Sequence, residues 1–469
     1  MECGSIDVPP RMKKISRRNF LKRSALLGAG ACVLPRFSIA RAGAGANGKL
    51  NLALIGTGGG IVKASIIGAK EENLVAICDV NEANLTIHAD LNPQIATAAK
   101  FRDFRVMLDK MGREIDAVVV TTPDHTHFAA TMDAMQRGKH VLTQKPLTHN
   151  IWQARTLRKA KQKYGVVTNM GNQGHTFKGI REMKEWLDAG VLGSVREVDS
   201  WYPGPTWGKG VWKKPGTFPP AAMPIPPDLD WPLWLGPVAD PGYNAIYAPV
   251  SWRGFEQFGT GAIGDFFCHI CDGPVWTLGL YTPTVIEAEK IDGPNPGMCP
   301  DGSIIRWDFA AREEMPPCIL RWYDGGNQPA KPEKWSWGEM PDKGSFFRGS
   351  KNTVYLDNVS SNPRLIDKEE MKAFKKAGLP PEKYPRVNGG PMAEWIRAIK
   401  GEGPEPGSNF DYSSRLTEVA CLGALAQRFG GRIEWDSENL RSPNRPELAP
   451  YIKEPVQKGW EYGEDLWKA

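Results

Sequence analysis

The feature that most constrains this chain is a regular alternation of short apolar runs and helical segments between residues 50 and 170. Each apolar run lacks a polar face, so we interpret each as a strand buried on both sides. Strands that alternate with helices in this way form a parallel, doubly wound sheet. The four predicted strands are LNLALI (50–55), NLVAIC (73–78), DAVVVTT (116–122) and KHVLTQ (139–144).

The first strand leads directly into a glycine-rich turn, GTGGGI. Glycines let the backbone turn tightly and approach a pyrophosphate, which binds the N–H groups at the start of the next helix. Ile61 holds the place where a dinucleotide-binding turn usually has its third glycine, and Gly60 precedes it. A structural strand–helix turn is the alternative. We predict a cofactor-binding turn made of Gly56, Thr57, Gly58, Gly59, Gly60 and Ile61, with the pyrophosphate over Gly58 to Ile61.

Asp79 ends the second predicted strand, 21 residues after Gly58. A carboxylate at this place accepts hydrogen bonds from the ribose hydroxyls of a dinucleotide and repels a 2′-phosphate. The sequence therefore predicts NAD rather than NADP as the cofactor, with Asp79 on the adenosine ribose.

Two further loops follow the carboxyl ends of predicted strands, where ligands of such sheets bind. In TTPDHTHFAA, Thr121 and Pro123 are expected beside the nicotinamide. His125 and His127 of the same loop either cap the next helix or contact ligand, and we place His127 with the cofactor. In GKHVLTQKPLT, Lys145 is a candidate to hydrogen-bond a substrate hydroxyl and to take part in proton transfer.

A third polar group comes much later, in GTGAIGDFFCHICD. Asp265 and His269 are four residues apart, so on a helix they share one face. A carboxylate beside an imidazole can hold its tautomer and raise its basicity. Dehydrogenation of a secondary alcohol needs a group that removes the hydroxyl proton, and we predict that Lys145 and His269 handle it while Asp265 orients His269.

The character of the chain changes after residue 170. An amphipathic helix (179–190) and a strand (195–201) come first, and well-spaced strand-like runs follow, as expected for an open, mainly antiparallel sheet. We therefore predict an α/β protein with a Rossmann domain at 43–170 and a second α/β domain at 171–469, whose late helices can pack back on the first.

Residues 1–42 carry nine Lys or Arg and two Asp or Glu, so the net positive charge of the chain comes entirely from this segment. SRRNFLK (16–22) is a twin-arginine pair before a weakly apolar, Gly/Ala-rich stretch that is too short to span a bilayer. We expect a twin-arginine signal peptide, with a periplasmic or exported protein that acquires its cofactor, tightly bound, before export. The nearly neutral remainder gives no electrostatic case for nucleic acid.

The cysteines after the leader suggest neither a metal site nor a specific pairing. An oxidising compartment permits disulfides, but the spacing names no pairs. CHIC (268–271) has no second ligand pair at zinc-finger spacing, so no metal is predicted.

With these motifs assembled, the chain after about residue 49 resembles the Gfo/Idh/MocA oxidoreductases. The resemblance rests on the glycine-rich turn, AICDV, TTPDHTH, GKHVLTQKPLT, WRGFEQFGTGAIGDFFCH and DYSSRLTEVA. It implies a Rossmann domain followed by an open-sheet α/β domain often used for homo-oligomer contacts. It also implies NAD(P) and sugar-like or cyclitol substrates.

The resemblance also assigns residues. Lys145 matches the lysine of the family's Glu-Lys-Pro, where Gln144 replaces the usual glutamate, and Asp265 and His269 match its Asp-x-x-x-His pair. We expect Gln144 and Lys145 to adjoin the cofactor. Substrate contacts are expected from Gln173, His175, Trp252 and Arg253.

Three functions remain open from the sequence. The first is an exported NAD-dependent oxidoreductase acting on a secondary hydroxyl of a sugar or glycoside. The second is a glycoside hydrolase or lyase that oxidises its substrate transiently to allow elimination. The third, suggested by Gln144, is a non-catalytic sugar-binding protein of the same fold.

Overall fold

A computed structural model describes residues 48–204 and 213–468, all within one compact unit, residues 44–469. The predicted signal peptide, residues 1–42, lies outside the described residues. Among the described residues, none of the helices has the length and apolarity needed to cross a membrane.

The N-terminal part of the unit contains a six-stranded sheet in the order β3-β2-β1-β4-β5-β6, with every neighbouring pair parallel. All four residues of β4 are buried, as a strand covered on both faces requires. Its strands are β1 (Asn51–Ile55), β2 (Asn73–Cys78), β3 (Ala99–Phe101), β4 (Ala117–Val120), β5 (His140–Thr143) and β6 (Thr168–Met170).

The four strands predicted from sequence are confirmed as β1, β2, β4 and β5. The sequence analysis missed the two edge strands, β3 and β6, because three residues are too few to show an apolar pattern. The connecting helices are α2 (Val62–Gly68), α3 (Gln94–Thr97), α4 (Phe104–Met111), α5 (Asp124–Gln136) and α6 (Ile151–Tyr164).

The second sheet has eight strands in the order β13-β12-β11-β7-β10-β9-β8-β14. Only β7 and β10 pair in parallel, so the expected open, mainly antiparallel sheet is confirmed. Its strands are β7 (Val195–Trp201), β8 (Val285–Asp292), β9 (Gly302–Phe309), β10 (Cys318–Asp324), β11 (Gly344–Gly349), β12 (Thr353–Leu356), β13 (Arg364–Leu365) and β14 (Arg432–Glu434).

Further α-helices follow the first sheet in the chain. They are α7 (Lys178–Asp188), α8 (Trp231–Leu235), α9 (Gly261–Ile270), α10 (Asp272–Leu278), α11 (Lys368–Ala377), α12 (Pro391–Lys400), α13 (Phe410–Phe429) and α14 (Ala449–Ile452). Short 3-10 turns include η1 (Glu82–Leu85), η2 (Gln173–Thr176) and η3 (Ser251–Gly254).

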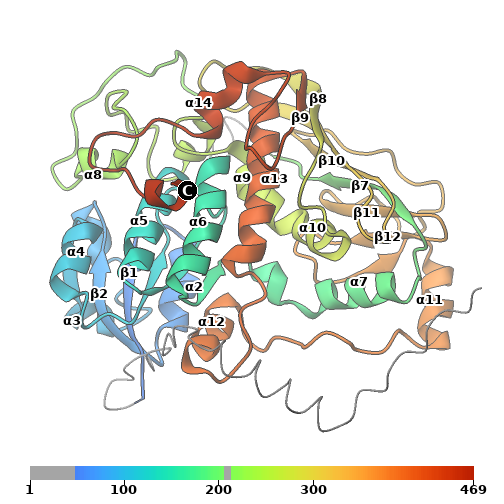
Figure 1. Ribbon diagram of the computed structural model, residues 1–469, viewed down its shortest axis with the longest axis horizontal. Coiled ribbons are helices and arrows are strands. Elements are labelled where there is room, and N and C mark those ends of the chain that lie inside the picture. Colours follow the sequence, from blue (N-terminus) through green and yellow to red (C-terminus); the bar gives the residue numbers. More distant parts are fainter. Residues whose placement is uncertain (1–47, 205–212, 469) are drawn as a thin grey trace, which may run out of the picture. The chain divides into compact units, whose positions relative to one another are not determined.

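The long helix α13 holds the two sheets together (Figure 1). It packs against α6 and β6 of the first sheet and against α9, β8 and β9 of the second. Gly423 allows the close approach, since a Cβ there would lie 2.2 Å from the ring of the buried Trp307. The domain boundary at residue 170 stays a prediction, although the first sheet does end at Met170 and the second begins at Val195.

Candidate active site

The glycine-rich turn joins the end of β1 to α2. Gly56 has φ +86°, and its N–H donates to the carbonyl oxygen of Cys78 at 2.8 Å. A Cβ at Gly56 would lie 2.8 Å from the backbone nitrogen of Thr122, so the turn needs glycine for both space and conformation. Gly60, in contrast, is exposed and has no atom within 4 Å of an added Cβ. The turn thus presents open backbone at the carboxyl edge of the sheet.

Asp79, at the end of β2, is buried and already bonded within the protein. Its carboxylate accepts the backbone N–H groups of Thr57 (2.7 Å), Gly58 (3.1 Å) and Asn81 (2.9 Å), and the side-chain amide of Asn84 (3.1 Å). The hydroxyl of Thr57 donates to the same carboxylate at 3.3 Å. A carboxylate offers about four acceptor positions, so these donors use them all. The ribose contact predicted for Asp79 therefore requires one of these donors to give way.

The loop after β4 lies against the same turn. Thr121 donates through Oγ1 to the carbonyl oxygen of Gly56. The ring nitrogens of His127 lie 2.8 Å from the carbonyl oxygens of Pro146 and Thr122, so His127 ties this loop to the loop after β5. Pro123 immediately precedes α5.

His125, the other histidine of the loop, is buried against two aromatic rings. Its Nε2 lies 2.9 Å from the carbonyl oxygen of Trp234, and its ring packs against Trp234 and Phe258. Burial lowers the pKa of His125 to about 3, so the ring is neutral and has a packing role.

Lys145, from the loop after β5, contacts Asp265 on α9. Its Nζ donates to Oδ1 of Asp265 at 2.5 Å and to the Asp265 carbonyl oxygen at 2.6 Å. Nε of Arg253 lies 3.5 Å from the same Oδ1. Burial alone would raise the pKa of Asp265, but Lys145 and Arg253 bring it down to about 2. Two motifs 120 residues apart therefore form one buried, charged cluster.

His269 lies one helical turn after Asp265 on α9, but the expected hydrogen bond between them is not formed. Neither ring nitrogen of His269 has a hydrogen-bond partner among the described residues, and Nδ1 is fully buried. Burial, together with the nearby Lys145, lowers the pKa of His269 to about 3 although Asp265 opposes the shift. The carboxylate thus holds Lys145, and His269 is a neutral imidazole with an unused basic nitrogen.

Asp124, the first residue of α5, is a member of the cluster that the sequence analysis missed. It is 5% exposed, and its carboxyl group has no hydrogen bond or ion pair within the described part of the chain. Burial raises its pKa to about 7, opposed by Arg253 and assisted by Asp265. Its position at the start of a helix, directly after a strand, is a feature of the sequence that indicates a ligand site. The neighbouring residues Pro123 and His125 were considered from the same loop, but Asp124 was not.

Gln144 precedes Lys145 and is buried. Its Oε1 has no partner in the described structure, and a Cβ at Gly171 would lie 2.5 Å from that oxygen. An unpartnered buried oxygen beside the strand ends is a place for a ligand donor, as expected of a residue that adjoins the cofactor.

The residues predicted to contact substrate divide into two groups. Trp252 and Arg253 lie in η3, and the guanidinium of Arg253 stacks 4.3 Å from the Trp252 ring, so both join the Lys145 cluster. Gln173 is exposed in η2. His175 is 1% exposed, and its Nδ1 lies 2.9 Å from Oδ1 of Asp272. Its described contacts do not include the Lys145 cluster, so its substrate role stays a prediction.

The residues at this edge of the sheet fit a dinucleotide. The open backbone at Gly59 and Gly60 can receive a pyrophosphate, Asp79 ends the neighbouring strand, and Gln144 offers an unused acceptor. No group of His, Cys, Asp and Glu side chains suited to a metal ion occurs in residues 48–204 or 213–468. The six cysteines of those ranges are all buried, free thiols.

Comparison with known protein families places the chain. Residues 50–172 match the oxidoreductase family model with an NAD-binding Rossmann fold, and residues 177–295 match the model of its C-terminal α/β domain. Together the two matches cover just over half of the chain. The chain belongs to the Gfo/Idh/MocA oxidoreductase family, as its motifs suggested.

Two individual relatives share less than 30% identity with this chain over the aligned regions. Levoglucosan dehydrogenase of Pseudarthrobacter phenanthrenivorans is 22% identical over 203 residues, which are 41% of this chain and 42% of that protein. A glycosyl hydrolase family 109 protein of Solibacter usitatus is 29% identical over 199 residues, 39% of this chain and 45% of that protein. Each alignment thus spans less than half of the relative.

Solved structures show the same fold over a longer span. The WlbA dehydrogenase from Bordetella pertussis, in complex with NADH and UDP-GlcNAcA, superposes with a TM-score of 0.54 at 16% identity. The match covers 83% of this chain and 99% of that one.

The two ends of the glycine turn differ in how they tolerate a side chain. Gly56→Ala should lower the free energy of unfolding by about 1–3 kcal/mol, because it combines a positive φ with a backbone clash. Gly60→Ala is the matched control and should change it by less than about 0.5 kcal/mol. Urea denaturation of both variants checks this, and equal losses would contradict the geometry described for the turn.

Asp124 should make stability depend on pH. Its folded pKa of about 7 lies above the unfolded value of about 3.9, so its contribution is full below about pH 4 and is lost as the pH rises through about 7. Asp124→Asn should remove this loss. The free energy of unfolding of the variant, relative to that of the wild type, should therefore rise by about 2–3 kcal/mol as the pH goes from 5 to 8. Denaturant titrations at each pH measure the difference, and parallel curves would contradict it.

Proposed function

We propose that this chain is an exported, NAD-dependent oxidoreductase that acts on a secondary hydroxyl of a sugar or glycoside. The observation that carries the proposal is the buried contact between Lys145 and Asp265, beside a neutral His269 and at the edge of the sheet where the glycine turn opens. The levoglucosan dehydrogenase likeness supports a sugar substrate.

The chain's own residues supply the proton chemistry. The neutral imidazole of His269 takes the hydroxyl proton, and the ammonium of Lys145 stabilises the negative charge that develops on that oxygen. Asp265 fixes the position of Lys145 through two hydrogen bonds. Trp252 and Arg253 line the sugar side of the site. When bound, the nicotinamide accepts a hydride from the carbon that carries this oxygen.

Cofactor choice and cellular location complete the proposal. The carboxylate of Asp79 disfavours a 2′-phosphate, which supports NAD over NADP. The twin-arginine pair at residues 17–18 supports export to the periplasm by the twin-arginine machinery, with NAD already tightly bound. The open sheet of the second half supports assembly into a homo-oligomer.

A second candidate is a glycosidase that uses transient oxidation. The likeness to the glycosyl hydrolase family 109 protein of Solibacter usitatus favours it. Oxidation of a ring hydroxyl to a ketone acidifies the neighbouring C–H bond. Loss of that proton allows the aglycone to leave by elimination, and water then adds in its place. Return of the hydride to the ketone restores the oxidised cofactor. A non-catalytic sugar-binding role leaves the Lys145 cluster without a purpose.

Replacement of the proton-handling groups should separate binding from chemistry. Lys145→Ala and His269→Gln should each lower kcat for sugar oxidation by about 10²–10⁴-fold, while NAD released from the denatured protein stays unchanged. Lys376→Ala, on the exposed face of α11, is the control with one charge removed. Wild-type turnover in both site variants, followed by NADH absorbance, would contradict the assignment.

The two enzymatic candidates differ in their products. A dehydrogenase should accumulate NADH with a sugar panel and release no aglycone from aryl glycosides. The elimination route should release aglycone without net NADH and place solvent deuterium on carbon 2 of the product. A purified protein that is folded and contains no NAD would support the non-catalytic alternative.

A further inference from the structure

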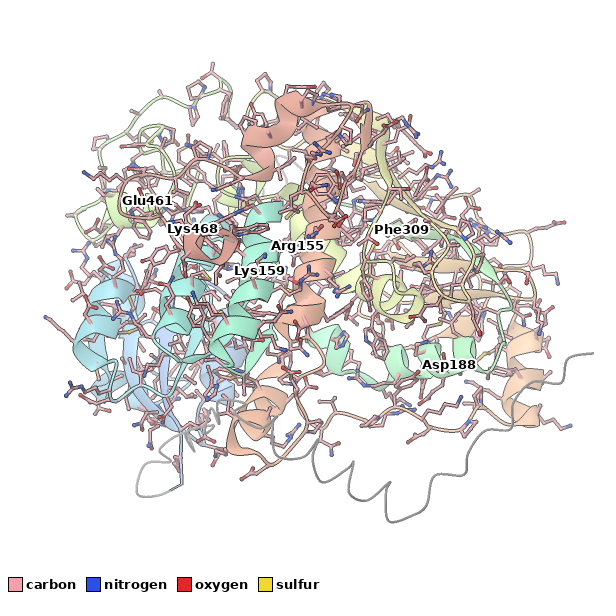
Figure 2. All side chains as sticks on the ribbon, in the orientation of Figure 1. Arg155, Lys159, Asp188, Phe309, Glu461 and Lys468 are labelled. Carbon is pink, nitrogen blue, oxygen red and sulfur yellow. The ribbon has the colours of Figure 1, made fainter. Side chains whose placement is uncertain are left out.

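A recess lies where α6 and α13 pack together, and it shares no residue with the Lys145 cluster. It has a volume of about 420 Å³ and is lined by both helices, by Tyr281 and Thr282 before β8, and by Ser437 and Glu438 after β14. Arg155, labelled in Figure 2 between the two helices, belongs to its wall. Three arginines line it: Arg155, Arg158 and Arg415.

Arg155 is held rigidly by the protein. Its Nε and its terminal nitrogen donate to the two carboxylate oxygens of Glu418 at 2.9 and 2.5 Å. It also donates to the carbonyl and hydroxyl oxygens of Ser437 at 3.0 and 3.1 Å. The only carboxylate that lies deep in the recess is therefore committed to Arg155.

Arg415 reaches the recess from α13. Its Nε donates to the backbone carbonyl oxygen of Asp411 at 3.2 Å, and its guanidinium lies 5.1 Å from the ring of Tyr281. At this distance the guanidinium is within range of a cation–π contact with the ring. It has no ion pair with a carboxylate in the described part of the chain.

Arg158 is the unusual member. It is half-buried one turn after Arg155 on the same face of α6, yet it makes no hydrogen bond or ion pair with any described residue. Burial first, and then Arg155 and Arg415, lower its pKa from its ordinary value, although Glu418 and Asp411 oppose the shift. Glu438, at the rim, is exposed and forms no ion pair in the described structure.

We propose that this recess binds a small oxyanion, a phosphate or sulfate group either free or carried by a sugar. Guanidinium forks match the oxygens of such groups and donate two parallel hydrogen bonds to them. Arg158 and Arg415 supply unused forks from two different helices, and Arg155, paired with Glu418, forms a fixed part of the wall. Outside residues 1–42 the chain is almost neutral, so the cluster does not reflect a generally basic surface.

Calorimetric titration of the purified, full chain tests the site directly. Inorganic phosphate, sulfate and glucose 6-phosphate should each bind saturably at constant ionic strength. Arg158→Gln should weaken phosphate binding by about tenfold or more, since a charge-assisted hydrogen bond is lost. Lys159→Gln is the matched control: it removes the same charge from the next residue of α6, where Lys159 packs on the Trp467 ring.

The relative affinities identify the source of the group. Tighter binding of glucose 6-phosphate than of inorganic phosphate assigns the site to a phosphorylated sugar, and the reverse order assigns it to the free ion. Equal phosphate affinity in the wild type and Arg158→Gln, or equal weakening by Lys159→Gln, would overturn the proposal.

Thermal unfolding adds a readout that a merely structural arginine would not give. Without any oxyanion, Arg158→Gln should unfold at the same temperature as the wild type or higher, because it relieves repulsion among the three arginines. With phosphate, the wild type should gain stability and the variant should not. The proposal would be overturned if Arg158→Gln unfolded at a lower temperature than the wild type without phosphate. It would also be overturned if phosphate raised the unfolding temperature of the variant as much as that of the wild type.

Discussion

The buried ion pair between Lys145 and Asp265 is the interaction on which the site depends. Lys145 follows β5 of the first sheet, and Asp265 lies on α9, which packs with α13 beside the second sheet. Two charges away from water are tolerated only when they are paired and hydrogen-bonded, so the contact fixes where α9 can lie. The geometry of the site is therefore a consequence of how the two sheets pack.

That pair also sets the electrostatics of its neighbours. Burial and the nearby ammonium keep His269 neutral, although the charge of Asp265 opposes them. The carboxylate of Asp265 is committed to Lys145 and forms no hydrogen bond to His269. Asp124 is buried without a partner, and this burial, assisted by Asp265, raises its pKa to about 7 although Arg253 opposes the shift. Two titratable groups beside this ion pair are thus in unusual protonation states, a pattern typical of functional sites.

Much of the fold could be read from the sequence because its signal is local. The strands that lie at the centre of the first sheet are mostly apolar, and the glycine turn follows one of them directly. The edge strands β3 and β6 have three residues each, and no periodicity can show in so short a run. Asp124 was missed for a different reason: its importance comes from burial beside Arg253 and Asp265, which lie far away along the chain.

The sequence by itself determined the parallel sheet, the dinucleotide turn and the residue types of the site, since each depends on neighbours within a few residues. Only the tertiary structure decided which groups meet. It paired Asp265 with Lys145, bonded the carboxylate of Asp79 to its own turn, placed His175 against Asp272, and gathered three arginines between α6 and α13. Those contacts join residues distant along the chain, and helix packing, which no local pattern encodes, brings them together.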